Sequence, residues 1–164
     1  MKKVLTEVSK CLGCHSCENA CAAVHSEAGS FLGAVLAGEK PRAAVRVLVG
    51  TDGAKLPLRC QHCASPACTD VCPTGAMQKD AETGAVWCDT ELCVGCFLCV
   101  DACPFGAIVA LEDRPFKCDL CRGREGGPAC AEACPTGALS FAEAVPAEVQ
   151  AMERRIIEIL KGAK

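Results

Sequence analysis

The sequence predicts an α+β chain made of two nested cysteine-rich modules, short β-hairpins and a C-terminal helix. Three observations lead to this fold class. The cysteines recur in four groups of four, and three groups end in the same five-residue motif. Short runs of β-forming residues, separated by turn residues, lie between the groups. An apolar segment with helical periodicity follows the last group.

Cysteine is the outlier of the composition, with 17 of 164 residues. At this density cysteines form either disulfides in a secreted chain or metal sites inside the cell. The N-terminus shows no apolar signal core, and no segment approaches the roughly 18 apolar residues of a membrane span. We therefore expect a cytoplasmic, soluble chain without a membrane span, whose cysteines bind metal.

The grouped cysteines follow one spacing pattern. Each group opens with Cys-x2-Cys and closes with a cysteine that follows the third after three residues. The four groups are Cys11, Cys14, Cys17 and Cys21; Cys60, Cys63, Cys68 and Cys72; Cys93, Cys96, Cys99 and Cys103; and Cys118, Cys121, Cys130 and Cys134. The last three groups continue as Cys-Pro-x-Gly-Ala.

This spacing indicates iron–sulfur chemistry. Three cysteines so spaced can ligate three irons of one [4Fe–4S] cubane, and the fourth reaches a neighbouring cubane. The proline then turns the backbone away from the cluster, and the glycine permits a tight turn. Zinc sites, which use four ligands per metal and rarely add a third cysteine and Cys-Pro, are one alternative; disulfides are the other. The sequence predicts four [4Fe–4S] clusters.

The order of the groups predicts a nested exchange of ligands, in which groups two and three form the inner pair and groups one and four the outer pair. We call the four resulting combinations cysteine sets 1 to 4. Set 1 is Cys11, Cys14, Cys17 and Cys134; set 2 is Cys60, Cys63, Cys68 and Cys103; set 3 is Cys93, Cys96, Cys99 and Cys72; set 4 is Cys118, Cys121, Cys130 and Cys21. The outer module would span residues 1–50 with 111–145, the inner module 51–110, and the C-terminal helix 146–164.

Charge excludes a nucleic-acid partner. The formal net charge is −3 when all thiols count as neutral. Each oxidised, cysteine-ligated cluster adds roughly −2, so the assembled protein would carry about −11. No basic face emerges from this balance.

The segments between the groups predict small elements. Residues 22–37 are helix-tolerant and are expected to continue outward from the first group, and residues 43–49 read as a strand. Two short hairpins are expected over 76–88 and 107–116, and a flexible insertion over 123–128.

The tail predicts a helix from Pro146 to about Lys161 with one apolar face. That face holds Val149, Met152, Ile156, Ile157, Ile159 and Leu160. It either covers the outer cluster pair or serves docking or self-association.

Several other residues could bind metal or carry chemistry. Cys88 stands outside the groups and is expected to be a small buried strand residue, with a ligand or redox role as the alternative. His15, His25 and His62 are expected to form hydrogen bonds or to pack, because four cysteine ligands already serve each cube. The basic residues near the ligands either offset cluster charge or solvate the surface: Arg59, Lys79, Lys117, Arg122 and Arg124. No catalytic triad, phosphate loop or dinucleotide fingerprint occurs, so we expect no catalytic residue.

Residues 1–141 resemble the four-cluster ferredoxin-type subunits of respiratory and anaerobic oxidoreductases. The stretches Cys11 to Ser26 and Leu56 to Cys63 are similar to the electron-transfer subunit of CO dehydrogenase systems, and similar subunits accompany tungsten aldehyde oxidoreductases and formate dehydrogenases. The resemblance implies two bacterial-ferredoxin-like 2[4Fe–4S] modules and supports the nested pairing. The short loop in group four and the short helical tail depart from the family pattern.

The expected function is electron transfer without bond chemistry. Every cube has four cysteine ligands, so no iron is left open for substrate. A non-catalytic subunit would relay electrons between a catalytic oxidoreductase subunit, such as CO dehydrogenase or a tungsten or molybdenum aldehyde or formate oxidoreductase, and a second redox partner. The alternatives are a free-standing polyferredoxin carrier, a cluster-based regulatory or assembly module, and a catalytic chain with a three-cysteine site.

Overall fold

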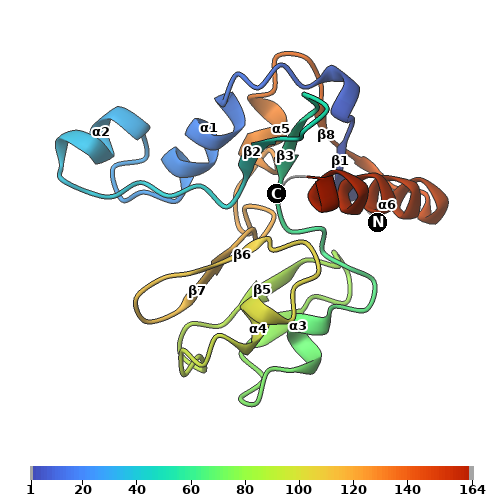
Figure 1. Cartoon of the computed structure of the whole chain (residues 1–164). Coiled ribbons are helices and arrows are strands. Elements are labelled where there is room, and N and C mark those ends of the chain that lie inside the picture. Colours follow the sequence, from blue (N-terminus) through green and yellow to red (C-terminus); the bar gives the residue numbers. More distant parts are fainter. Residues whose placement is uncertain (1, 163–164) are drawn as a thin grey trace.

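The computed structural model describes residues 2–162, which form two lobes and a long C-terminal helix (Figure 1). The terminal lobe combines both ends of the chain: β1 (Lys2–Thr6), η1 (Val8–Lys10), α1 (Ser16–Val24), α2 (Phe31–Leu36), β2 (Arg46–Val49), β3 (Lys55–Leu58), α5 (Ala129–Glu132) and β8 (Leu139–Glu143). The central lobe holds the middle of the chain: α3 (Ala67–Asp70), β4 (Met77–Lys79), β5 (Val86–Cys88), α4 (Leu98–Asp101), β6 (Ile108–Ala110) and β7 (Pro115–Lys117). The last helix is α6 (Pro146–Gly162). Within residues 2–162 no helix is long and apolar enough to cross a bilayer.

The strands form antiparallel pairs. Strand β2 pairs with β3, β4 with β5, and β6 with β7, each across a short turn. These pairs confirm the expected mixed fold with short hairpins. The predicted module boundaries, 50/51 and 110/111, lie between the paired strands of the first and third hairpins, and the module division stays a prediction.

The fourth pair, β1 with β8, was not predicted from the sequence. It joins the two ends of the cysteine-bearing region, with Val4 opposite Phe141 and Thr6 opposite Leu139. Val4 and Leu139 are almost fully buried, so the pair closes the core of the terminal lobe. The five-residue β1 carries no clear sequence alternation, and its partner lies at the other end of the chain; pattern alone therefore could not find the pairing.

The helix-tolerant stretch over residues 22–37 does not form one continuous helix. The chain forms two helices instead, α1 and α2, separated by a turn at residues 25–30. Gly29 takes a left-handed φ of 63° in this turn, and Ser30 then caps α2 by accepting a hydrogen bond from the Gly33 N–H at 3.1 Å. A composition of small residues tolerates a helix but does not mark such a break.

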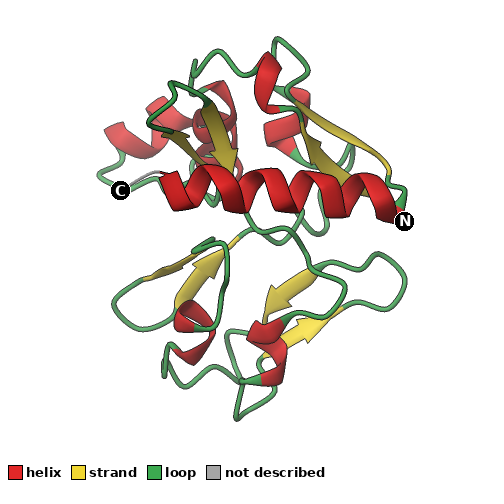
Figure 2. Ribbon diagram, turned by 45° about the vertical axis from the view of Figure 1, so that its right-hand side comes forward, coloured by secondary structure: helices red, strands yellow, loops and turns green. Residues whose placement is uncertain are grey.

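The C-terminal helix lies across the boundary between the two lobes (Figure 2). Its buried face is the predicted one: Ile156 and Ile159 are almost fully buried. They pack with Leu56 and Leu58 of β3 and with Phe105. Cys63 and Cys103 also pack against this group, so the helix lies beside cysteines of set 2. One of the two expectations from the sequence placed it over the outer cluster pair instead. Residues 163–164 of the predicted helix lie outside the described residues.

Truncating a buried side chain on α6 is expected to destabilise the protein. The Ile156→Ala variant should lose about 2–5 kcal/mol, because it removes buried methylene groups and leaves a cavity next to Leu56. The measurement is the urea midpoint of the intact protein under anaerobic conditions. Arg154→Ala, at an exposed position of the same helix, is the matched control and should leave the midpoint unchanged. Equal midpoints for the two variants would contradict the packing role of α6.

Candidate metal centre

All four cysteine groups share one backbone feature. The residue two positions after the first cysteine has a left-handed φ: 71° at Gly13, 47° at His62, 68° at Gly95 and 62° at Leu120. A non-glycine residue in this region is strained and persists where the surroundings demand it. Successive backbone N–H groups in such turns form concavities that bind anions, including iron–sulfur clusters. The loops therefore fit an anionic group held by the cysteines.

Backbone N–H groups also point at the thiols. Cys60 Sγ accepts from the His62 N–H at 3.5 Å, and Cys118 Sγ accepts from the Leu120 N–H at the same distance. Such hydrogen bonds stabilise a thiolate over a thiol. The loops that begin at Cys60 and Cys118 therefore present their first thiol to the same kind of backbone donor.

The fourth cysteine of each group is held separately. In the three Cys-Pro-x-Gly-Ala motifs the thiol accepts a backbone hydrogen bond of 3.4 Å from a following residue, in the pairs Cys72 with Met77, Cys103 with Ala107 and Cys134 with Leu139. Cys21 lacks the motif, and its thiol accepts from the more distant Ala44 N–H at 3.3 Å. Burial raises the pKa of Cys72, but hydrogen bonds from the Met77 N–H and from Thr74 outweigh it and hold that pKa below its usual value.

The structure brings the cysteines of sets 1 and 3 together. Set 1 lines one small cavity of about 20 Å³, to which Cys134 comes from the far end of the chain. The cysteines of this cavity are Cys11, Cys14, Cys17 and Cys134. Set 3 lines a second small cavity of about 20 Å³, whose cysteines are Cys72, Cys88, Cys93, Cys96 and Cys99.

Several cysteines of sets 2 and 4 lie together in the hydrophobic core. Cys21 packs in the same buried hydrophobic cluster as Cys118 and Cys130, which also contains Cys17 and Cys60. Cys103 packs against two groups of buried hydrophobic residues; Cys63 packs against one of them, and Cys68 belongs to the other. The fourth cysteine of each group therefore lies with cysteines of another group.

Burial has a consequence for loading with metal. It raises the pKa of Cys118 and Cys130 to about 12 and the pKa of Cys21 to about 11. Without metal these thiols are protonated at neutral pH. Ligation requires thiolates, so assembly releases these protons.

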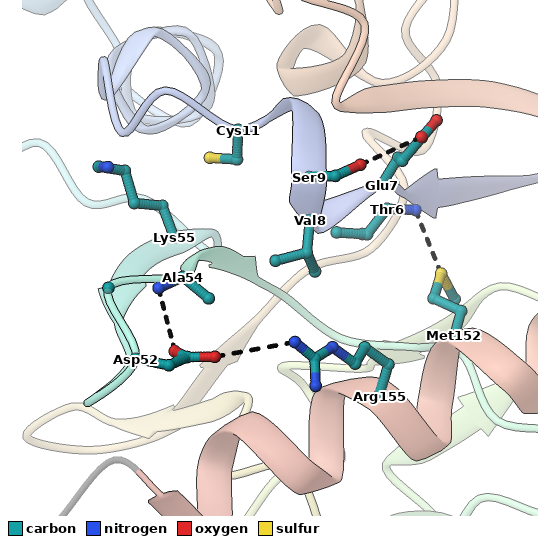
Figure 3. Close-up of a pocket in the computed structure, with 11 residues that line it drawn as sticks. Thr6, Glu7, Val8, Ser9, Cys11, Asp52, Ala54, Lys55, Met152 and Arg155 are labelled. Carbon is teal, nitrogen blue, oxygen red and sulfur yellow. Dashed lines mark hydrogen bonds and ion pairs between the residues drawn. The ribbon is translucent and has the colours of Figure 1, made fainter.

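Set 1 borders an open groove of about 630 Å³ (Figure 3). Cys11 faces this groove, which η1, the β2–β3 turn and α6 enclose. The Thr6 N–H donates to Met152 Sδ at 3.1 Å, and Arg155 lies 3.8 Å from Asp52. Helix α6 thus forms one wall of the groove that Cys11 of set 1 also lines.

The three histidines have partners other than metal. His15 Nδ1 lies 2.9 Å from Glu18 Oε2. The Val86 N–H donates to His62 Nδ1 at 2.8 Å, so the His62 proton lies on Nε2; burial, with Lys117 and Arg59 nearby, keeps its pKa well below the usual value. His25 stacks edge-on against Phe116 at 5.6 Å between ring centroids.

His25 has one contact that the sequence did not indicate. Its ring nitrogen lies within 4.8 Å of a carboxylate oxygen of Asp119 and of Cys121 Sγ. Cys121 already belongs to set 4, so this contact is part of the predicted cluster site. No sequence signal links residues 25 and 119.

Cys88 lies nearer the site than expected. It ends β5 and lines the cavity of set 3, where it is half-buried. Burial first, and then the neighbouring Cys93, raises its pKa to about 12. Cys88 is therefore a protonated thiol beside a set that already has four cysteines.

The basic residues near the ligands divide into two kinds. Lys79 bonds to the Ala64 carbonyl at 2.5 Å, Arg122 stacks over Trp87 at 4.1 Å, and Arg124 pairs with Glu132 at 2.6 Å; these three are surface contacts. Arg59 and Lys117 are buried.

Gly95 is the loop position where a side chain is least tolerated. A Cβ there would lie 2.5 Å from the Asp113 carbonyl oxygen, in a backbone with φ +68°. We expect Gly95→Ala to lose iron from set 3 because the loop must move. Gly75→Ala is the matched control: it has the same φ but no atom within 4 Å of the added Cβ. Iron per chain measures the effect, and equal iron in the two variants would rule out the steric explanation.

Known proteins share this pattern of residues. A family model described as "4Fe-4S dicluster domain" matches residues 52–144, and a second with the same description matches residues 7–76. An "Iron-sulfur protein" of Rhodospirillum rubrum is 38% identical over 93% of this chain and 87% of its own length. "Electron transport protein HydN" of Escherichia coli strain K12 is 35% identical over 93% of this chain and 94% of its own length. "Putative oxidoreductase UacF" of the same strain is 38% identical over 77% of this chain, which covers only 19% of that longer protein.

The paired cysteine loops, the inward N–H groups and these matches agree on one chemistry. The first family model alone covers more than half of the chain. The residues present fit [4Fe–4S] clusters, because cysteine thiols converge and backbone N–H groups line the same loops. This chain therefore belongs to the 4Fe-4S dicluster domain family of ferredoxin-like iron–sulfur proteins.

Proposed function

We propose that this chain is a non-catalytic electron-transfer subunit that holds four [4Fe–4S] clusters in cysteine sets 1 to 4. It would relay electrons between a catalytic oxidoreductase subunit and a second redox partner. The observation that carries the proposal is the convergence of the fourth cysteine of each group on cysteines of another group. This convergence supports the two nested modules as well as the ligand sets.

When bound, the clusters supply one-electron transfer, and the chain's own residues decide where it can occur. Sets 1 and 4 share α1, which carries both Cys17 and Cys21. Sets 2 and 3 meet around Cys68 and Cys99 in the core of the central lobe. Cys60 of set 2 packs with Cys118 of set 4. The four sets therefore form a row with sets 1 and 3 at its ends.

The ends of this row reach the surface. Cys14 of set 1 and Cys96 of set 3 are exposed, whereas Cys60 and Cys118 are buried. Exposed cysteines at both ends, with buried ones between, suit an entry and an exit for electrons. All four sets have four cysteines, so substrate chemistry at an open iron is disfavoured.

A lasting partner is favoured over a free-standing carrier. Helix α2 exposes four large apolar side chains, from 44% at Phe31 to 80% at Leu36. An exposed apolar patch of this kind marks a protein contact. The apolar face of α6 packs inside the chain, so we assign the contact to α2 and not to self-association through α6.

The names of the relatives support the class of partner. HydN is named an electron transport protein, and UacF contains a matching segment within a longer putative oxidoreductase. The resemblance of residues 11–26 and 56–63 to CO dehydrogenase subunits makes that enzyme the first donor to test, followed by aldehyde and formate oxidoreductases. Because the ligand thiols must stay reduced before loading, we place the protein in the cytoplasm.

The test is anaerobic purification of the untagged protein from its native host. We expect about sixteen irons per chain, interacting signals in the EPR spectrum of the reduced protein, and a large redox enzyme in the same fraction. Zinc or far fewer irons would overturn the ligand sets. Full iron without a companion chain would favour the free carrier, and substrate turnover by the isolated chain would contradict the non-catalytic role.

A further inference from the structure

Two buried basic residues lie at the junction of sets 2 and 4. Arg59 is 2% exposed and Lys117 is 6% exposed. Each immediately precedes the first cysteine of its group, Cys60 or Cys118. Basic side chains are almost never this buried without a compensating partner.

Arg59 is held by oxygen atoms of the backbone. Its Nη1 donates to the Cys60 carbonyl at 2.8 Å, and its Nη2 donates to the Val4 carbonyl and lies 3.4 Å from Thr6 Oγ1. Its Nε has no hydrogen-bond partner among residues 2–162. Burial lowers the pKa of Arg59, but a guanidinium stays protonated in proteins, so the buried charge remains.

Lys117 is held in the same way. Its Nζ donates to the Val86 carbonyl and, at 2.7 Å, to the Cys118 carbonyl. In the part of the chain that the structure describes, neither Lys117 nor Arg59 forms an ion pair with a carboxylate. Neutral carbonyls do not cancel a full positive charge, so both cations lack a counter-ion among residues 2–162.

The two cations reach across the junction. Arg59 precedes Cys60 of set 2, and Cys60 packs in the same buried hydrophobic cluster as Cys118 and Cys130 of set 4. Lys117 precedes Cys118 of set 4, and its Nζ donates to the carbonyl of Val86, which packs in the same buried hydrophobic cluster as Cys68 of set 2. Each cation therefore lies beside residues that pack with cysteines of both sets.

Negatively charged clusters in sets 2 and 4 are the counter-ions that this arrangement lacks. We propose that Arg59 and Lys117 form a positive bridge that raises the reduction potentials of the two middle clusters above the values they would otherwise have. A nearby buried positive charge favours the reduced form because that form carries the greater negative charge. This inference rests on the proposed function, because it requires clusters in both sets.

Among residues 2–162 no basic side chain is buried beside the end sets as Arg59 and Lys117 are beside the middle ones. Lys10 and Leu92, which precede the first cysteines of groups one and three, are exposed. Water screens a charge at Lys10, so its influence on a cluster in set 1 is weak. The bridge therefore distinguishes the middle of the row from its ends.

The test is an EPR-monitored redox titration of the iron-loaded protein. In Lys117→Met and in Arg59→Gln, the equilibrium constant for one-electron reduction of the middle clusters should fall at least tenfold, which is a shift of 59 mV to more negative potential. Lys117→Arg and Arg59→Lys keep the charge and should shift far less. Lys161→Met and Arg154→Gln, at exposed positions on α6, are the matched surface controls. The signal that is missing from a Cys118→Ala/Cys130→Ala variant identifies the set 4 cluster.

A second pair of variants leaves Arg59 in place and changes the residue beside it, so that only one variant offsets its charge. Thr6→Asp places a carboxylate beside Nη2, and Thr6→Asn places an uncharged side chain of the same shape there. The aspartate variant should shift the set 4 potential in the same negative direction, and the asparagine variant should not. The Thr6 pair tests whether the charge of Arg59 affects the potential even if Lys117→Met and Arg59→Gln fail to take up clusters.

The outcomes are distinct. Unchanged potentials in iron-loaded neutral variants, or equal shifts for Thr6→Asp and Thr6→Asn, would overturn the bridge. Equal shifts of all four clusters would also overturn it, because the effect would then not be confined to the middle. Iron content and reversible reduction of the unmodified protein test the proposed function separately, and neither depends on the bridge.

Discussion

Removing Cys21 from a protein that has already lost the set 4 cluster should cost no further iron. In a Cys118→Ala/Cys130→Ala background we expect about twelve irons per chain, since one of four cubanes is absent. Adding Cys21→Ala should leave that number unchanged. The reason is that Cys21 packs with Cys118 and Cys130 and accepts a hydrogen bond from Ala44, away from the set 1 cavity.

The matched control lies on the same helix. Cys17 is as buried as Cys21, yet it lines the set 1 cavity. Adding Cys17→Ala to the same background should therefore remove one to about four further irons, because a second cubane loses a ligand. Iron per chain and the EPR spectrum of the reduced protein measure both. If Cys21→Ala also removed iron, each group would serve its own cube and the nested pairing would be wrong.

Removing iron should abolish the tertiary structure altogether. The strand pairs β2–β3, β4–β5 and β6–β7 are two-stranded, and such hairpins are marginal alone. Helices α3, α4 and α5 have four residues each, far below the length that is stable in isolation. The chain has five Phe, one Trp and no Tyr, so large side chains cannot compensate. Binding of metal is folding free energy in such proteins.

The buried charges of Arg59 and Lys117 also destabilise the folded protein when iron is absent. Without clusters, Arg59 and Lys117 would remain buried with no anionic partner, which costs several kcal/mol per ion. That cost is comparable to the free energy of unfolding of an ordinary domain, which is about 5–15 kcal/mol. We expect the protein without iron to lack a cooperative unfolding transition.

The measurement is near-UV circular dichroism with limited proteolysis, before and after anaerobic treatment with an iron chelator and a thiol reductant. The near-UV signal should disappear, and cleavage should reach the central lobe. Chelator already saturated with iron is the control, and re-addition of iron and sulfide should restore the signal. A stable, cooperatively unfolding protein without iron would contradict this role of the clusters.

Sequence pattern suffices where the interacting residues lie close together in the chain. The hairpins over 76–88 and 107–116 were predicted because β-forming runs flank turn residues close together in the chain. The buried face of α6 was predicted because Ile156 and Ile159 recur at helical spacing. The break between α1 and α2 was missed, because it depends on one turn and on the Ser30 cap rather than on periodicity.

The sequence by itself determined the cofactor chemistry of this protein, since cysteine spacing and the Cys-Pro-x-Gly-Ala repeats are local features that bind one kind of cluster. Only the tertiary structure decided that Arg59 and Lys117 are buried whereas Lys79, Arg122 and Arg124 make surface contacts, although all five lie near ligands in the sequence. It also decided that β1 and β8 join the ends of the cysteine-bearing region. The physical reason is that spacing acts along the chain, whereas burial and charge depend on which distant segments pack together.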